Sequence, residues 1–138
     1  MVTKEKADEV LAVLKAEIKA AVANGIEFYP QVGAHIEDGR WIGSGARTNC
    51  TCAVGCLLLN RQPPAPAEYR DDVWSASEIL KVNYEWLIQV YTGVVSAERF
   101  DSIEKMKRHT SYHPEAARVA WELRRYGDEL MAEKGGWK

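Results

Sequence analysis

Three cysteines within one seven-residue stretch give this chain its clearest capacity for covalent chemistry. They are Cys50, Cys52 and Cys56, and the sequence has no others. A thiol at the N-terminus of a helix has a lowered pKa, because the positive end of the helix dipole favours the thiolate. Cys50 precedes a segment that we expect to be helical, so it is the best candidate for a nucleophile. A general base would come from the histidines of the chain: His35, His109 and His113.

The same cysteines also fit an inert packing role, and we favour that interpretation. The predicted helix from Thr51 to Asn60 is apolar on nearly every side, and a helix without a polar face is usually buried. Cysteine is also among the residue types most often found in protein interiors. An odd, clustered set of cysteines makes a poor disulfide framework, so we expect reduced thiols in a cytoplasmic protein.

Two of the cysteines and two histidines share a spacing that would suit a four-ligand zinc site. Cys52 and Cys56 are four residues apart in the chain. His109 and His113 repeat that spacing, and structural zinc sites are built from Cys and His side chains. Against this, a helical cysteine pair inside an apolar run lacks the turn that usually presents such ligands, and Pro114 biases His113 away from helix. We therefore expect no bound metal and no other cofactor.

A tryptophan surrounded by arginines distinguishes the last predicted helix. Trp121 lies almost opposite the apolar stripe of that helix, and its basic neighbours at helical spacing are Arg118, Arg124 and Arg125. The preceding segment would extend the basic surface with Lys105, Lys107 and Arg108. We call these residues together the Trp/Arg surface. Because Trp and Arg are favoured anchors of interfaces, the group is either a second packed face or a site for a protein partner or a second copy of this chain.

Residues 75–93 resemble the helix-turn-helix family of DNA-binding motifs, with two short helices that meet near Lys81. The turn of that family usually carries glycine where this chain has lysine. The second helix, which would be the recognition helix, contains the acidic Glu85 and no Lys or Arg. DNA binding depends largely on phosphate neutralisation by basic side chains. We therefore expect two packed helices here and keep nucleic-acid binding as an alternative.

Hydrophobic spacing and capping residues predict a mainly α-helical fold, with five to six helices around one core. The predicted helices cover residues 3–23, 51–60, 75–82, 84–92, 97–108 and 114–134. Ser75 and Glu78 form a capping box that would open the third of these helices. Gly93 would end the fourth.

A small β-hairpin is predicted near residues 34–43. Asp38-Gly39 supplies a residue pair suited to a tight turn, because both central positions need a positive φ. The expected cross-strand pairs are Glu37 with Arg40 and Ile36 with Trp41. Together with the helices, the hairpin would belong to a single compact domain over residues 1–138.

The composition is that of an ordinary globular chain. The 138 residues carry 18 Lys and Arg against 20 Asp and Glu, a formal net charge of −2, and 46% of them are hydrophobic. These values exclude a disordered tail and a strongly basic protein that coats nucleic acid through bulk charge. No apolar run approaches the roughly 20 residues of a membrane-spanning helix. The charged N-terminus also lacks the apolar core of a secretion signal, which again favours the cytoplasm.

Residues 48–58, 76–82 and 85–87 resemble a loose group of small uncharacterised phage and bacterial proteins. These proteins carry a Cys-Ala-x-Gly-x-Leu helix followed by a short helix pair. The resemblance implies a mobile-element origin and brings no established activity or catalytic residue. We therefore expect a small non-enzymatic binding or regulatory protein that acts through the Trp/Arg surface. A cysteine enzyme, a zinc-binding protein and a DNA-binding protein are the alternatives.

Overall fold

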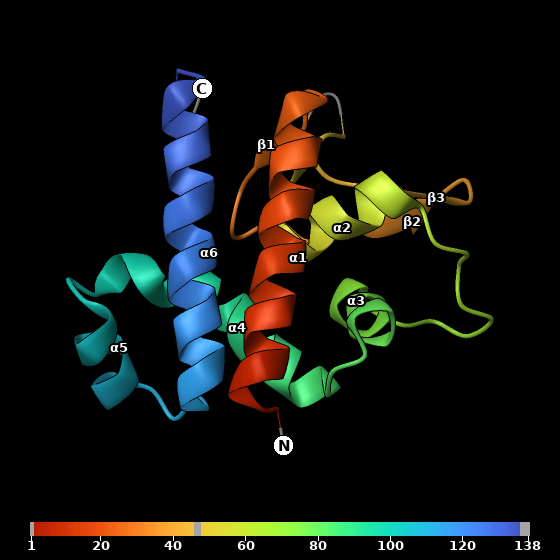
Figure 1. Ribbon diagram of the computed structural model, residues 1–138. Helices are drawn as coiled ribbons and strands as arrows, with labels where there is room; N and C mark the ends of the chain where they lie inside the picture. Colours follow the sequence, from red (N-terminus) through yellow and green to blue (C-terminus); the bar gives the residue numbers. More distant parts are fainter. Residues whose placement is uncertain (1, 46–47, 136–138) are drawn as a thin grey trace.

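Six α-helices and two short pairs of strands make up the described part of the computed structural model, residues 2–45 and 48–135 (Figure 1). The helices are α1 (Lys4–Ala23), α2 (Ala53–Arg61), α3 (Asp72–Leu80), α4 (Tyr84–Ser96), α5 (Ile103–His109) and α6 (Pro114–Glu133), with a 3-10 turn, η1 (Ala97–Arg99), after α4. The strands are β1 (Glu27–Phe28), β2 (His35–Glu37), β3 (Arg40–Ile42) and β4 (Cys50–Thr51). The predicted mainly α-helical fold with a small hairpin is confirmed. Over the same described ranges, no helix has both the length and the apolar character needed to cross a membrane.

The core lies around α6, which packs against α1 and α4. α1 and α6 stand side by side and run in the same direction, and α4 passes behind them (Figure 1). The predicted apolar stripes face this core. Their fully buried members are Ala7, Leu14, Ile18 and Ala21 on α1 and Ala116, Val119 and Leu123 on α6. Burial of each large aliphatic side chain contributes about 1.5–3 kcal/mol, so these two stripes supply much of the driving force for folding.

The hairpin forms with the predicted register. Asp38 and Gly39 have φ angles of 51° and 76°, and the pairs Glu37 with Arg40 and Ile36 with Trp41 face each other. The outer edge of β3 is covered by the side-chain amide of Gln62, the residue that ends α2. The Trp41 backbone N–H donates to Gln62 Oε1 at 2.8 Å, and Gln62 Nε2 donates to the Trp41 carbonyl at 2.8 Å.

A second strand pair, which the sequence analysis did not predict, shortens α2 at its start. β1 pairs with β4 in parallel, and the Tyr29 backbone N–H donates to the Thr51 carbonyl at 2.8 Å. The helix predicted from Thr51 therefore begins only at Ala53. Within α2, Gly55 packs so closely on the Thr51 side chain that a Cβ atom would overlap it. Close packing therefore explains the presence of a glycine in this helix.

α3 begins at Asp72, so the predicted capping box at Ser75 is wrong. Asp71 is the N-cap residue, and its Oδ1 accepts a hydrogen bond from the Trp74 backbone N–H at 2.7 Å. Ser75 lies buried inside the helix instead. Carboxylates suit a helix N-terminus because they accept from free N–H groups and interact with the helix dipole. The consecutive Asp71 and Asp72 therefore start the helix upstream of the serine.

Gly93 does not end α4, which continues to Ser96. Its role is close packing, since a Cβ atom at Gly93 would lie only 2.7 Å from the Cβ atom of Ala120 on α6. The glycine thus lets two core helices approach each other. Glycine can end a helix or allow close packing against another helix. The sequence alone does not separate these two roles, because the second depends on the neighbouring helix.

The helix predicted over residues 97–108 is interrupted. Phe100 is extended after η1, and α5 has its own N-cap at Ser102. The Ser102 hydroxyl accepts a hydrogen bond from the Lys105 backbone N–H at 3.2 Å. Serine favours such a cap because its oxygen satisfies an N–H group that has no partner within the helix.

The contact of β1 with α6 gives a test of the packing. The ring of Phe28 lies against Gly127, and a Cβ atom at Gly127 would overlap that ring. We expect Gly127→Ala to lower the free energy of unfolding by about 1–3 kcal/mol through overpacking. Alanine intrinsically favours a helix over glycine by about 1 kcal/mol, so the effect runs against helix propensity. Urea denaturation followed by circular dichroism measures the change.

The matched control is Ala16→Gly at an exposed position of α1. It measures the backbone preference alone and should cost about 1 kcal/mol. A Gly127→Ala variant as stable as the original chain would contradict the packing described for Phe28.

Candidate functional site

The three cysteines lie where their thiols are held in the neutral form. Cys52 is the buried N-cap residue of α2, and burial raises its pKa to about 12. Cys56 is fully buried in the same helix, and burial raises the pKa of its thiol as well. Cys50 lies on β4 rather than at a helix N-terminus, and partial burial together with the nearby Glu27 carboxylate raises its pKa. The predicted activation of Cys50 by a helix dipole therefore does not occur.

Two of the three histidines proposed as general bases, His35 and His113, are bound to local partners. His35 is exposed on β2, with its Nε2 3.4 Å from Glu37 Oε2. His113 is the N-cap residue of α6, and its Nδ1 accepts a hydrogen bond from the Glu115 backbone N–H at 3.1 Å. A ring nitrogen that accepts in this way is already occupied by the fold.

The four candidate zinc ligands are not gathered around one point. Cys52 and Cys56 are buried in α2, whereas His109 is exposed at the end of α5 and stacks on Phe100 with ring centroids 6.2 Å apart. His113 begins the next helix. Over residues 2–45 and 48–135, no group of three or more His, Cys, Asp or Glu side chains is placed to hold a metal ion.

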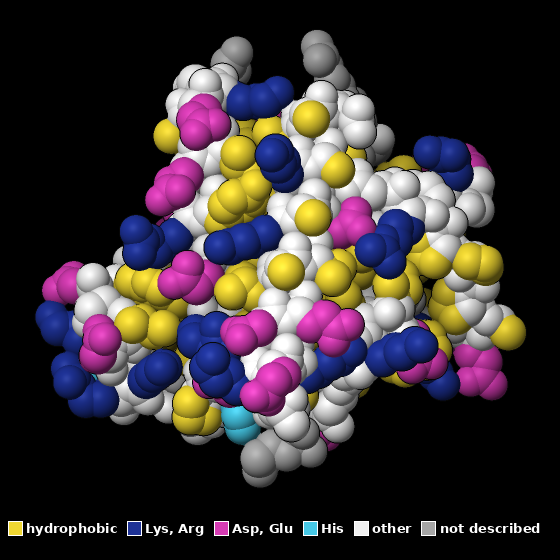
Figure 2. Space-filling view, viewed as in Figure 1, with side chains coloured by type: hydrophobic (Ala, Val, Ile, Leu, Met, Phe, Trp, Pro, Cys, Tyr) yellow, Lys and Arg dark blue, Asp and Glu magenta, His cyan; other side chains and the backbone are white. Residues whose placement is uncertain are grey.

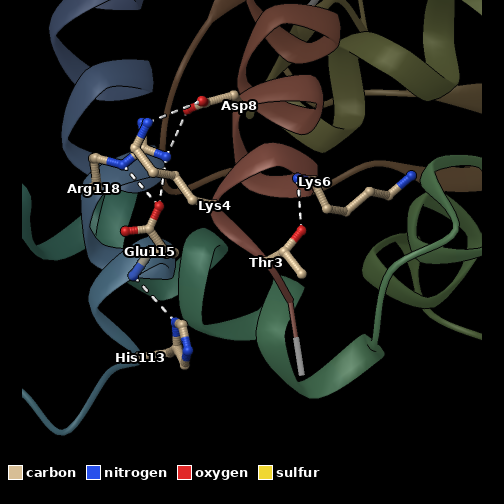
Figure 3. A network of polar contacts seen from close by, with 7 residues as sticks. All are labelled: Thr3, Lys4, Lys6, Asp8, His113, Glu115 and Arg118. Atoms are coloured by element: carbon tan, nitrogen blue, oxygen red, sulfur yellow. Dashed lines mark hydrogen bonds and ion pairs between the residues drawn. The ribbon is translucent and has the colours of Figure 1, made fainter.

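Arg118 of the Trp/Arg surface joins α6 to α1 (Figure 3). Its Nη2 lies 2.7 Å from Asp8 Oδ1 and 2.6 Å from Glu115 Oε1. Lys4 reaches the same Asp8 carboxylate at 3.6 Å. The hydrogen bond from Arg118 is the main reason that the pKa of Asp8 lies below its usual value. The Arg118 guanidinium therefore serves the contact between the two parallel helices.

Arg124 closes the C-terminal end of α4. Its Nη1 donates to the carbonyls of Val94 and Val95 at 2.8 and 3.3 Å. Its other nitrogens pair with Glu98 at 3.1 Å and Asp128 at 2.9 Å. The last carbonyls of a helix lack partners within the helix, and a cation is favoured beside them. Arg124 thus links the end of α4 to α6.

The other members of the Trp/Arg surface differ in exposure. Trp121 is only partly exposed and packs against the core cluster, and Lys105 pairs with Asp101 at 2.8 Å. The remaining cations are Lys107, Arg108 and Arg125, which are exposed and form no ion pair within the described residues. Figure 2 shows Lys and Arg side chains gathered over α5, with acidic side chains among them. The predicted surface therefore has two parts. Arg118 and Arg124 hold helices together, whereas Lys107, Arg108 and Arg125 face the solvent.

The helix pair that resembles a helix-turn-helix motif is formed by α3 and α4, which pack together. The turn between them passes through Lys81 in a left-handed conformation, with φ of 57°. Trp86 and Leu87 of α4 are buried, and its exposed first turn carries Glu85. The helix offers no basic side chain for phosphate contacts.

A cavity that no sequence pattern indicates lies between the hairpin and α3. Its volume is about 430 Å³, and its walls include Trp41 of β3, Tyr69 and Arg70 of the linker before α3, and Asp72. Tyr69 is 89% exposed, an unusual position for a large aromatic side chain. The run Tyr69-Arg70-Asp71-Asp72 signals a polar site with an aromatic neighbour, but its proximity to the hairpin depends on the tertiary fold.

Searches against family models, characterised proteins and solved structures returned no match to this chain. The function is therefore inferred from the geometry of the chain's own residues.

Thiol reactivity tests the placement of the cysteines. In the native protein at neutral pH we expect iodoacetamide to leave Cys52 and Cys56 unmodified and to modify Cys50 slowly, because the thiolate is the reactive form and each pKa is raised. Labelling of Cys50 should increase as the pH rises toward that pKa. Peptide mass spectrometry gives the rate at each position, with the urea-unfolded chain as the reference. Native labelling of Cys50 as fast as in the unfolded chain would restore the nucleophile hypothesis.

Paired arginine variants test the division of the Trp/Arg surface. We expect Arg124→Ala to lower the free energy of unfolding by about 1–3 kcal/mol, because it leaves the carbonyls at the end of α4 without their charged donor. Arg125→Ala, an exposed position on the same helix, should change it by less than about 0.5 kcal/mol. Urea denaturation measures both, and equal losses would show that Arg124 has no special role in the fold.

Proposed function

We propose that this chain is a small cytoplasmic binding or regulatory protein without enzymatic activity, which contacts a protein partner or a second copy of itself. The contact would use the solvent-facing part of the Trp/Arg surface, with Lys107 and Arg108 on α5 and Arg125 on α6. An accessory role in a phage or another mobile element agrees with the resemblance in residues 48–58. The exposure of these unpaired cations on two helices that pack together is the observation that carries the proposal.

Charge segregation supports a partner with an acidic surface. The seven residues of α5 hold Lys105, Lys107 and Arg108 against the single acid Glu104, although the whole chain has a formal net charge of −2. Complementary charge accelerates association and sets the orientation of partners. Half-buried Trp121 gives the adjoining α6 an apolar edge that such a partner can cover.

The chemistry of the polar side chains also favours binding over catalysis. A nucleophile needs an adjacent base or a lowered pKa. All three thiols have raised pKa values, and His113 is held as a helix cap by its bond to Glu115. The three cysteines and His113 therefore fit structural roles better than catalytic ones.

Charge reversal on α5 tests the proposal. We expect Lys107→Glu combined with Arg108→Glu to abolish self-association or partner binding and to leave the circular dichroism spectrum unchanged, since both residues are exposed. Native mass spectrometry reports the subunit number, and affinity purification from the producing cells with quantitative mass spectrometry reports bound proteins. The matched control is Lys19→Glu with Lys134→Glu, which changes the net charge equally at exposed positions elsewhere.

If the control pair behaves like the α5 pair, bulk charge explains the binding and the proposed surface is wrong. If both variants keep the same partners and subunit number as the original chain, the α5 cations have no part in recognition.

A further inference from the structure

The cavity between the hairpin and α3 has the chemistry of a site for a positively charged ligand. Its volume of about 430 Å³ falls within the range of about 300–1,000 Å³ that is usual for small-molecule sites. The hairpin and α3 lie on one side of α1 and α5 lies on the other (Figure 1), so the cavity is separate from the Trp/Arg surface. We propose that this cavity binds a small organic cation, one that carries an ammonium or guanidinium group.

Asp72 supplies the principal negative charge. Its Oδ2 accepts a hydrogen bond from the Ala34 backbone N–H at 3.0 Å, and its Oδ1 accepts from the Val73 backbone N–H at 2.9 Å. No cation pairs with this carboxylate within the described residues, and burial raises its pKa. A carboxylate that is partly removed from water without a counter-charge is costly. A cationic ligand in the cavity would provide that counter-charge.

The position of this carboxylate is built into the fold. Gly33 passes so close to Asp72 that a Cβ atom there would lie 2.6 Å from Asp72 Oδ2. The absence of a side chain at Gly33 lets the backbone reach the carboxylate, and the Ala34 N–H then fixes its orientation. Both oxygens keep further acceptor capacity, because each carboxylate oxygen can accept two hydrogen bonds.

Two tyrosines close to Asp71 and Asp72 have raised pKa values. Tyr91, on α4, lines the cavity, and burial, assisted by the nearby Asp72 carboxylate, raises its pKa to about 12. Asp71 accepts a hydrogen bond from the Tyr84 hydroxyl at 2.6 Å, which raises the pKa of Tyr84 to about 12. Burial by itself disfavours a charge of either sign, whereas the carboxylates of Asp71 and Asp72 would attract a cation.

Aromatic side chains complete the walls. Trp41 is buried on the hairpin side, and Tyr69 stands at the rim, 89% exposed. A cation placed over an aromatic face gains about 0.5–2 kcal/mol from the ring quadrupole. The combination of carboxylates with aromatic faces is typical of sites for organic ammonium groups.

The protein's own cations beside the cavity are engaged elsewhere. Arg70 stacks over the ring of Trp74, 5.2 Å from its centroid, and pairs with Glu68 at 3.4 Å. His35 faces Glu37. Because no described group of three His, Cys, Asp or Glu side chains could hold a metal ion, an organic cation fits the cavity better than a metal ion.

Isothermal titration calorimetry at fixed salt concentration tests the proposal with three probes. Choline presents an ammonium group and agmatine a guanidinium and an amine, whereas 3,3-dimethyl-1-butanol has the shape of choline without its charge. We expect choline or agmatine to bind, and the neutral alcohol to bind at least about tenfold more weakly. If neither cation binds, or if the alcohol binds as tightly as choline, the proposal is wrong.

Substitutions of Asp72 and Tyr69, with a control at Asp101, then assign the binding to this cavity. Asp72→Asn should weaken cation binding about tenfold or more. Asp101→Asn, the same substitution at an exposed site on the other side of the molecule, should leave cation binding unchanged.

Tyr69→Ala, which removes an exposed ring with little effect on folding, should weaken cation binding about two- to fivefold. Tyr69→Phe keeps the ring and should retain the binding. Equal binding by the Asp72 and Asp101 variants, or by all three Tyr69 forms, would place the cation elsewhere and overturn the proposal. The Asp72 and Tyr69 outcomes do not depend on the α5 surface, because neither residue belongs to it; of the variants, only the control Asp101→Asn lies beside that surface, where Asp101 pairs with Lys105.

Discussion

Burial of the apolar side of α6 is the interaction on which the rest of the structure depends. α1, α4, α5 and β1 all pack on this one helix. Small residues set the distances of closest approach, since Gly127 receives the ring of Phe28 and Ala120 faces Gly93. Hydrophobic burial has no direction of its own, so these close contacts and the ion pairs at the rim determine how each neighbour is oriented.

Arg118 and Arg124 show how the polar rim follows from that packing. The first binds Asp8 of α1, and the second binds the last carbonyls of α4. Each joins α6 to an element on a different side of the helix. Arginine suits this role because its guanidinium donates several hydrogen bonds in a fixed geometry. Arginines that suggest a recognition surface in a sequence can therefore instead connect the helices of the fold.

The parts of the fold that depend on local sequence were predictable. The stripes of α1 and α6 follow from a helical period that stays regular over five turns, and the hairpin follows from Asp38-Gly39. Pairing between β1 and β4 was not predictable, because each strand is too short to show alternation and its partner is distant in the chain. The same limit applies to the site. The exposure of Lys107 and Arg108 could be anticipated, whereas the engagement of Arg118 with Asp8 required the tertiary arrangement of two helices.

The amide of Gln62 has a consequence for the behaviour of the protein at high concentration. A strand at the border of a sheet exposes main-chain groups that can recruit a strand from another molecule. The Gln62 side chain offers one acceptor and one donor to Trp41, as a neighbouring peptide group would. It thereby occupies the outer edge of β3, so that this edge cannot serve as a template for intermolecular β-aggregation.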